Sequence, residues 1–234
     1  MTVLVTGGAG FIGRRLVPAL RARGKPVRVL AREPVTVEGA ETVVGDVTRA
    51  ETLPAALAGV DAVIHLVAIL QGKPEDFARV IGEGTRNVVE AAREAGVRRF
   101  VYQSALGLNE QSRETIPYFR GKWAAEQAVT GSGLEYVIVR PSFVFAGDGG
   151  AFPLFSKLAR RAPLTPIVGS GTQRIQPVWI DDMVEVLARA VDEPRAANRT
   201  FDLGGPDALD WNAFWARLKE ALGVRRPSVH VRWG

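Results

Sequence analysis

The stretch that decides the fold lies near the start of the chain and reads Val3-Leu4-Val5-Thr6-Gly7-Gly8-Ala9-Gly10-Phe11-Ile12-Gly13. It combines an apolar run, a turn of glycines and the start of a helix. Gly7 permits a sharp turn, Gly10 lets backbone N–H groups approach an anion, and Gly13 lets the helix pack closely on the strand. The amino end of the helix then offers an anion unpaired N–H donors and a favourable dipole.

Glycines also serve ordinary turns, so the surroundings of the motif decide how it is interpreted. Here a strand precedes the glycines, a helix follows, and a second apolar run begins at Val27. This context favours a dinucleotide-binding βαβ unit whose loop from Gly7 to Gly13 holds the pyrophosphate of NAD or NADP. The loop residues predicted to bind the cofactor are Gly7, Ala9, Gly10, Phe11, Ile12 and Gly13.

From Thr2 to about Val144, short valine-rich runs alternate with amphipathic stretches of helical period. This pattern is typical of the α/β class, and we predict a Rossmann-type doubly wound parallel sheet with a small C-terminal substrate-side region. The predicted strands are Val3–Thr6, Val27–Ala31, Glu41–Val44, Ala62–Leu66, Arg99–Gln103 and Glu135–Arg140. The predicted helices are Ile12–Ala22, Glu51–Leu57, Glu75–Ala95 and Tyr118–Thr130.

After Pro141 the pattern changes, because a glycine cluster and the proline-rich stretch Pro153–Pro166 interrupt the alternation. We therefore divide the chain into a dinucleotide-binding core, residues 1–144, and a mainly substrate-side region, residues 145–234, with elements at about 174–204 returning to the core. In this second part we predict helices at Asp181–Val191 and Trp211–Leu222, a strand at Thr200–Leu203 and a final strand at Ser228–Trp233.

Composition limits the classes of protein that fit. The chain has 234 residues, 47% of them hydrophobic, no cysteine and two histidines. We expect a well-buried core, no disulfide and no metal site. No charged leader precedes the first apolar run, and no apolar stretch is long enough to span a membrane, so we expect a cytoplasmic protein without membrane insertion. The net charge of +5 permits nucleic-acid binding, but the basic residues are spread along the chain, so we expect none.

The choice between NAD and NADP is expected at the end of the second strand, which reads Val27-Arg28-Val29-Leu30-Ala31-Arg32. An acidic side chain there would bind the ribose 2′-hydroxyl of NAD. Alanine stands at that position and Arg32 follows, whose guanidinium can pair with a 2′-phosphate. We predict NADP(H) rather than NAD(H), with the neighbouring Glu33 as the counter-argument and a solvated surface arginine as the alternative for Arg32.

Several further segments resemble the extended and atypical short-chain dehydrogenase/reductases, a superfamily that includes epimerases and dehydratases. They are Gly45-Asp46-Val47, His65-Leu66-Val67-Ala68, Gly84-Thr85-Arg86-Asn87-Val88-Val89-Glu90-Ala91-Ala92, Arg140-Pro141-Ser142 and Val178-Trp179-Ile180-Asp181-Asp182. With the glycine loop they follow the order of the family over nearly the whole chain. Within the superfamily, Gln103-Ser104-Ala105-Leu106-Gly107 is most similar to proteins like the NADPH-binding accessory subunit of respiratory complex I.

The resemblance implies roles for individual positions in cofactor binding. Asp46 and Val47 would lie beside the adenine, and Leu66, Val67 and Ala68 would line the ribose. Pro141 and Ser142 would flank the nicotinamide. For the apolar strand residues, plain core packing is the alternative, and we interpret His65 as a core residue at the end of a strand rather than as a base.

The predicted chemistry depends on Tyr118-Phe119-Arg120-Gly121-Lys122, because a Tyr-x-x-x-Lys spacing places both side chains on one face of a helix. A lysine ammonium beside a phenol favours the phenolate, so Tyr118 could exchange a proton with a substrate oxygen while hydride moves to or from nicotinamide. The resemblance implies that Lys122 also binds the nicotinamide ribose. Ser104, at the end of the preceding strand, is the candidate hydroxyl that assists Tyr118.

Two departures from the family pattern weaken the catalytic assignment. The helix position that usually supplies an asparagine is matched by Ile81, and the assisting hydroxyl falls on Ala105 if Ser104 lies one position too early. We therefore consider an NADP(H)-dependent oxidoreductase acting on a small carbonyl or alcohol, and alternatively a non-catalytic NADPH-binding sensor or assembly protein. A nucleotide-sugar epimerase or dehydratase is a third reading. The substrate is not predicted, and a protein partner or a homo-oligomer stays open.

Overall fold

The computed structural model describes residues 1–150 and 152–232. The chain forms two compact units, one built from Met1–Pro141 with Asp181–Leu203 and the other from Ser142–Ile180 with Gly204–Gly234. The first unit therefore ends before the predicted boundary at residue 144. The returning segment is also shorter than the predicted range of about 174–204, because the two short strands that precede Asp181 pair within the smaller unit.

The larger unit is built around a seven-stranded sheet in the order β12-β6-β5-β4-β1-β2-β3. Every neighbouring pair is parallel, with Val3 of β1 opposite Val27 of β2 on one side and Ala62 of β4 on the other. The chain order reverses on either side of β1, so the carboxyl ends of β1 and β4 flank the crevice where this class of sheet binds ligands. The strands are β1 (Val3–Thr6), β2 (Val27–Ala31), β3 (Glu41–Val44), β4 (Ala62–His65), β5 (Arg99–Gln103), β6 (Glu135–Pro141) and β12 (Arg199–Leu203).

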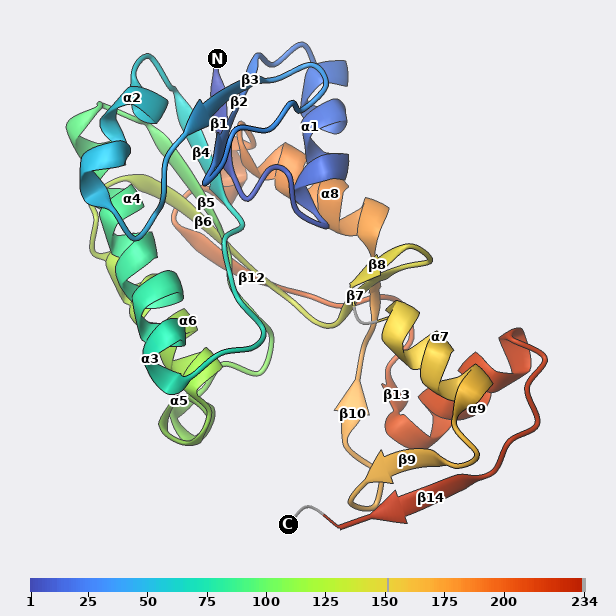
Figure 1. Ribbon diagram of the computed structural model, residues 1–234. Helices are drawn as coiled ribbons and strands as arrows, with labels where there is room; N and C mark the ends of the chain where they lie inside the picture. The colour runs from blue at the N-terminus through green and yellow to red at the C-terminus, as the bar shows by residue number, and fades with distance from the viewer. Residues whose placement is uncertain (151, 233–234) are drawn as a thin grey trace. The chain divides into compact units, whose positions relative to one another are not determined.

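Helices cover both faces of this sheet (Figure 1). On one face lie α1 (Gly13–Ala22) and α8 (Ile180–Ala190), which are joined by the Arg23–Glu185 ion pair. The other face carries α2 (Pro54–Leu57), α4 (Gly84–Glu94) and α6 (Pro117–Thr130). This is the predicted doubly wound arrangement, and it is confirmed.

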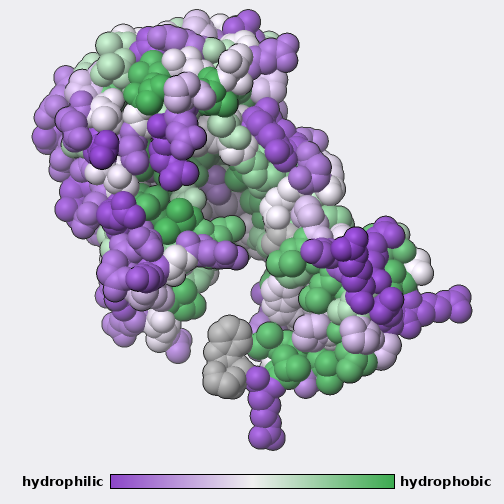
Figure 2. Space-filling view, in the orientation of Figure 1, coloured by the Kyte–Doolittle hydropathy of each residue, from purple (hydrophilic) through white to green (hydrophobic). Residues whose placement is uncertain are grey.

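The sheet is apolar on both faces because both are covered. Val3, Val5 and Val29 are fully buried, as the continuous valine-rich runs require. The helices are amphipathic: α4 buries Val88, Val89 and Ala92, while its charged residues face outward. The space-filling view shows a mainly hydrophilic surface over α2 and α4 (Figure 2). The core therefore lies between the sheet and its two helical layers.

Two predicted helices are divided in the structure. The stretch predicted as Glu75–Ala95 consists of α3 (Pro74–Phe77), a π-helix (Ala78–Glu83) and α4. A π-helical turn inserts one extra residue, which periodicity alone does not show, and such turns occur often at functional sites. The stretch predicted as Glu51–Leu57 is a 3₁₀ turn at Ala50–Thr52 followed by α2, because Pro54 lacks an N–H and can only begin a new helix.

Two helices were missed by the sequence analysis. The helix α5 (Glu110–Thr115) is capped by Asn109, whose side chain accepts a hydrogen bond from the Ser112 N–H at 2.9 Å. The helix α7 (Phe152–Arg161) lies in the stretch that we interpreted as a proline-rich interruption. Pro153 is compatible with the first turn of a helix, where its missing N–H costs nothing.

The smaller unit combines short strands with two helices that share an aromatic cluster. Phe155 of α7 packs edge-on against Phe214 and Trp215 of α9, with ring centroids 5.5 and 5.4 Å apart. The final strand was predicted at Ser228–Trp233. In the structure it begins at Ser228 and ends at Val231, and Trp233 lies outside the described residues. The remaining elements are β7 (Val144–Ala146), β8 (Gly149–Gly150), β9 (Thr165–Val168), β10 (Arg174–Ile175), β11 (Val178–Trp179), β13 (Leu209–Asp210), α9 (Trp211–Ala221) and β14 (Ser228–Val231).

Candidate functional site

The glycine loop forms a tight turn between β1 and α1. Gly7 has φ +77°, a conformation that side chains disfavour, and its carbonyl accepts the Gly10 N–H at 3.0 Å. A Cβ atom on Gly13 would lie 2.3 Å from the Gly7 oxygen and 2.5 Å from the Gly8 Cα. Only glycine fits at Gly13, because the obstructing atoms belong to the backbone.

Gly8, which the sequence analysis left without a role, also requires glycine. A Cβ atom there would lie 2.7 Å from Cγ2 of Val29 on the neighbouring strand β2. The absence of a side chain thus lets the loop lie directly against β2. The position of Gly8 within the glycine motif was the sequence signal that could have identified this requirement.

The electrostatics of the loop suit an anion. The first turn of α1 contains no acidic residue, and its N-terminus has no side-chain cap. Arg14 and Arg15 follow instead, with their guanidinium carbons 5.9 and 5.6 Å from the centroid of the Phe11 ring. The positive end of the helix dipole and the N–H groups of the first turn favour a negatively charged group at this position. The loop residues therefore fit a dinucleotide pyrophosphate.

The segment after β3 forms the expected adenine side of the site. The Asp46 carboxylate accepts hydrogen bonds from the Thr48 N–H and hydroxyl, both at 2.9 Å. Burial raises the pKa of Asp46, but these hydrogen bonds and the charges of Arg32 and Arg49 outweigh it, so the net pKa lies below its usual value. Asp46 is consequently ionised, and Arg32 is close enough to act on it.

Val47 is held in place from a neighbouring helix. Its carbonyl accepts a hydrogen bond from the Asn87 side-chain amide of α4 at 2.9 Å. A Cβ atom on Gly84, the first residue of α4, would lie 2.9 Å from Cγ2 of Val47. Asn87 and Gly84 therefore fix the turn that carries Asp46 and Val47, a function that sequence reasoning did not assign to them.

The end of β4 lies beside the glycine loop. The Leu66 N–H donates to the Thr6 carbonyl at 3.1 Å, and a Cβ atom on Gly7 would lie 3.4 Å from the Leu66 backbone. Leu66 and Val67 are half-buried and Ala68 is exposed. These three residues thus lie at the carboxyl edge of the sheet, where the resemblance places the cofactor ribose.

His65 is a buried structural residue. Its Nδ1 lies 2.6 Å from the Thr6 hydroxyl, and its Nε2 lies 3.0 Å from the Thr85 hydroxyl. The Thr85 hydroxyl donates to the Ile81 carbonyl at 2.6 Å, so it must accept from His65, which assigns the proton to Nε2. Burial, together with the charge of Lys122, lowers the pKa of His65 from 6.5 to about 3. A neutral imidazole with both nitrogens occupied does not act as a base.

This environment predicts acid sensitivity. The unfolded chain protonates His65 near pH 6.5, whereas the folded chain resists protonation down to about pH 3. Stability should therefore fall as the pH drops from 6.5 towards 3, by up to about 1.4 kcal/mol per pH unit. Urea unfolding at a series of pH values measures this slope. The His65→Gln variant, which does not titrate in this range, should show a shallower slope, and an unchanged slope would contradict the assignment.

Tyr118 and Lys122 lie one turn apart on α6. Lys122 is 1% exposed, and its Nζ donates to the Gln103 carbonyl at the end of β5 at 2.7 Å. The same Nζ lies 4.9 Å from the centroid of the Tyr102 ring and 5.8 Å from that of Tyr118. The fold thus brings the Tyr-x-x-x-Lys pair to the carboxyl edge of the sheet, as its proposed role requires.

One expectation about this pair is corrected. We expected Lys122 to lower the pKa of Tyr118, whereas burial raises the pKa of Tyr118 to about 12. Burial also lowers the pKa of Lys122 to about 7, and Glu126 opposes this only in part. A lysine that is only partly charged at neutral pH does not offset the loss of water around the phenol.

Ser104 follows Gln103 at the end of β5 and is 1% exposed. Its hydroxyl has no hydrogen-bond partner, and neither has the side-chain oxygen of Gln103. Buried polar atoms without partners are costly and usually signal a missing ligand or a functional role. These two atoms are therefore available to a ligand beside Lys122. Ile81, at the position where the family carries asparagine, is fully buried in the π-helix and has no polar side chain to offer.

The predicted nicotinamide residues divide between the two units. Pro141 ends β6, and its carbonyl accepts the Leu106 N–H at 2.9 Å. Ser142 is the first residue of the smaller unit, and its hydroxyl accepts the Gln176 N–H at 3.4 Å. Pro141 therefore belongs to the same edge as Ser104, while the role of Ser142 stays a prediction.

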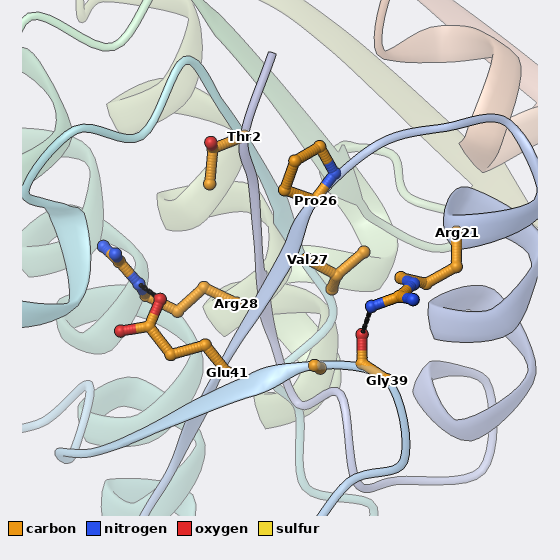
Figure 3. A pocket seen from close by; sticks show the side chains of 8 residues that line it. Thr2, Arg21, Pro26, Val27, Arg28, Gly39 and Glu41 are labelled. Carbon is orange, nitrogen blue, oxygen red and sulfur yellow. Dashed lines mark hydrogen bonds and ion pairs between the residues drawn. The ribbon is translucent and has the colours of Figure 1, made fainter.

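A separate hollow lies at the opposite edge of the sheet (Figure 3). It is lined by residues at the amino ends of the strands, including Thr2, Val27 and Glu41, together with Arg21 of α1. Its polar groups are already paired: Arg28 bonds to Glu41 at 2.8 Å, and Arg21 bonds to the Gly39 carbonyl at 2.5 Å. This hollow is remote from the loop and the Tyr118–Lys122 pair, so we do not assign the cofactor to it.

Within residues 1–150 and 152–232, no group of three or more His, Cys, Asp or Glu side chains could hold a metal ion. Over the same described residues, no helix combines the length and the apolar character needed to cross a membrane.

Comparison with known proteins places this site in a family. A family model described as NAD(P)H-binding matches residues 7–161, which include the glycine loop, Asp46 and the Tyr118–Lys122 pair. The chain belongs to the NAD(P)H-binding family. Its sheet order and Rossmann-like fold are those of the short-chain dehydrogenase/reductase type.

Several relatives of this NAD(P)H-binding protein are named dehydrogenases or reductases. A 3 beta-hydroxysteroid dehydrogenase/Delta 5-->4-isomerase of Mycobacterium tuberculosis is 29% identical over 99% of this chain and 73% of its own length. A ceramide reductase of Caulobacter vibrioides is 36% identical over 79% of this chain and 59% of its own length. Among solved structures, a short-chain dehydrogenase/reductase superfamily protein from Agrobacterium tumefaciens with bound NAD has a TM-score of 0.81 and 30% identity, covering 99% of this chain and 85% of that one. This NAD(P)H-binding protein is thus an NAD(P)-dependent oxidoreductase by family; its likeness to complex I accessory subunits stays a prediction.

Proposed function

We propose that this protein binds NADP(H) in preference to NAD(H) and interconverts a small carbonyl compound and its alcohol. The observation that carries the cofactor choice is the end of β2, where Ala31 replaces an acid and Arg32 follows at the carboxyl edge of the sheet. The charge of Arg32 acts on Asp46, which supports its placement beside the adenosine end of the crevice. A guanidinium there binds a 2′-phosphate in a fork and gains little from a 2′-hydroxyl.

The proposed chemistry assigns three residues of this chain. When bound, the nicotinamide cofactor supplies or accepts the hydride. Tyr118 gives its phenolic proton to the substrate oxygen, and its raised pKa of about 12 keeps that proton in place at neutral pH. A phenol that holds its proton can act as an acid. The direction of reaction that needs an acid is the reduction of the carbonyl compound, so this is the direction that Tyr118 favours. Lys122 binds the cofactor ribose, and the unpartnered Ser104 hydroxyl is placed to bond the substrate oxygen.

The role of Arg32 gives a prediction for cofactor selectivity. In the Arg32→Ala variant we expect the Kd for NADPH to rise about tenfold. The variant loses one charge-assisted hydrogen bond, which contributes about 1.5–3 kcal/mol, and water replaces part of this contribution. The Kd for NADH should change less than about twofold, since a neutral 2′-hydroxyl gains little from a cation. Isothermal titration calorimetry with both cofactors measures this.

The matched control is Arg93→Ala, which removes an exposed arginine from the last turn of α4. It should leave both affinities unchanged. Equal losses of NADPH and NADH affinity in Arg32→Ala would contradict the selectivity assignment. If neither cofactor binds the unmodified protein at millimolar concentration, the proposed function itself is wrong.

A second candidate function is supported by Ile81 and Ala105. Ile81 cannot relay a proton, and Ala105 offers no hydroxyl if the family position falls there rather than on Ser104. Such a site could retain NADPH as a structural or sensing element without turnover. Binding to the native state alone would then stabilise the fold by mass action. Substitution of Tyr118 separates the two functions, as described in the Discussion.

A further inference from the structure

A buried ion pair lies directly beyond Lys122. Glu126 is one turn further along α6 and is 4% exposed. Arg140 of β6 holds it in a fork, with Nε donating to Oε1 at 2.9 Å and Nη2 donating to Oε2 at 2.6 Å. The hydrogen bonds that Arg140 donates to Glu126 raise the pKa of Arg140 despite its partial burial. The fork therefore fixes the carboxylate in position and orientation.

Stability alone does not account for this pair. The cost of removing two charges from water often cancels their attraction, and apolar side chains of similar volume commonly replace such pairs without loss. What distinguishes Glu126 is its neighbour. Lys122 shares its helix face at the i, i+4 spacing, is fully buried, and among the described residues forms no ion pair with any carboxylate.

The groups around Lys122 leave Glu126 as its source of negative charge. His65 is neutral, and burial raises the pKa of both Tyr102 and Tyr118, so neither phenol is ionised near pH 7. Burial lowers the pKa of Lys122, and Glu126 is the charge that raises it. The titratable and charged groups concerned are His65 on β4, Tyr102 on β5, Tyr118 and Glu126 on α6, Arg140 on β6, and Asp202 on β12, which acts on Arg140.

We propose that Glu126, fixed by the fork of Arg140, is a positioning residue that favours the charged form of Lys122 at the carboxyl end of β5. The Gln103 carbonyl accepts one hydrogen bond from the ammonium, and the remaining N–H donors can serve a ligand at the Ser104 edge. The role of the ammonium towards the cofactor rests on the proposed function, but its charge state does not. Arg140 acts through Glu126, because its two hydrogen bonds fix the carboxylate one helical turn from Lys122.

The charge state of Lys122 can be measured directly. The chain has five lysines, Lys25, Lys73, Lys122, Lys157 and Lys219, so carbon-13 labelling at lysine Cε gives a spectrum of few signals. The signal that disappears in Lys122→Arg assigns Lys122. We expect its NMR titration to move to lower pH by about one unit or more in Glu126→Gln, a tenfold change in proton affinity. A shift under about 0.3 units would overturn the proposal.

Two further variants complete this experiment, one as an alternative to Glu126→Gln and one as a control. Glu126→Gln/Arg140→Met removes the pair without leaving a buried guanidinium unpaired, so it should fold even if Glu126→Gln does not. Lys122 should titrate at lower pH in this variant too, and a wild-type titration would overturn the proposal. Glu41→Gln, which removes the Arg28–Glu41 pair shown in Figure 3, should leave the Lys122 titration unchanged.

Cofactor binding distinguishes the two proposals from each other. If Lys122 binds the cofactor as an ammonium, the pH above which NADPH affinity falls should drop in Glu126→Gln by the same interval as the NMR titration. If the unmodified protein binds no NADPH, the proposed function fails, while the titration of Lys122 still decides whether Glu126 controls its charge.

Discussion

Replacement of Gly13 by alanine is expected to abolish cofactor binding. The added Cβ atom would lie 2.3 Å from the Gly7 oxygen and 2.5 Å from the Gly8 Cα, so the loop backbone has to move. This movement displaces the N–H groups that face the pyrophosphate. We expect the Kd for NADPH to rise at least about 100-fold, equivalent to about 2.7 kcal/mol. Overpacking should also lower the free energy of unfolding by about 1–3 kcal/mol.

Calorimetric titration with NADPH and urea unfolding measure the two effects separately. Gly10→Ala provides a graded comparison, because its Cβ atom would lie 3.1 Å from the Gly7 oxygen and needs only a small adjustment. Gly147→Ala is the matched control, since nothing lies within 4 Å of its added atom and its φ is not positive. Wild-type NADPH affinity in Gly13→Ala would contradict the assignment of the loop.

Replacement of Tyr118 by phenylalanine should separate an enzyme from a non-catalytic binder. If Tyr118 donates the proton to the substrate oxygen, kcat/KM should fall by about 10²–10⁴-fold, the usual contribution of a general acid. NADPH affinity should stay within about twofold, because the phenyl ring keeps the edge contacts with Phe77 and Phe119. The measurement is NADPH oxidation with a panel of ketones, together with calorimetric titration of the cofactor.

The control is Tyr136→Phe, which changes a half-buried tyrosine on β6 that packs against the same core. It should leave turnover unchanged. Equal turnover in Tyr118→Phe and the unmodified protein would exclude Tyr118 as the acid. A protein that binds NADPH but reduces none of the ketones before any substitution would favour the sensing or assembly function, which Ile81 and Ala105 suggest.

The elements that sequence predicts well are those whose causes are local. The strands β1, β2, β3 and β5 have the predicted bounds, because valine-rich runs between glycine turns have few alternatives. The π-helix at Ala78–Glu83 was not predicted, since it depends on close packing against α6. There, a Cβ atom on Gly121 would lie 2.8 Å from the Phe77 oxygen. The helix α7 was missed because two prolines near its ends were interpreted as breaks in the chain.

The features of the candidate site also fall into those that the sequence predicts and those that depend on tertiary structure. The sequence by itself determined the parallel sheet, the glycine loop and the arginine after β2, because each depends on residues that are neighbours in the chain. Only the tertiary structure decided how the charges behave. Lys122 is buried against Tyr102, and Glu126 is fixed by Arg140, fourteen residues further along the chain. Burial and the packing of α6 on the sheet set the pKa values of Tyr118 and Lys122, and no local pattern of residues records the depth at which a side chain comes to lie.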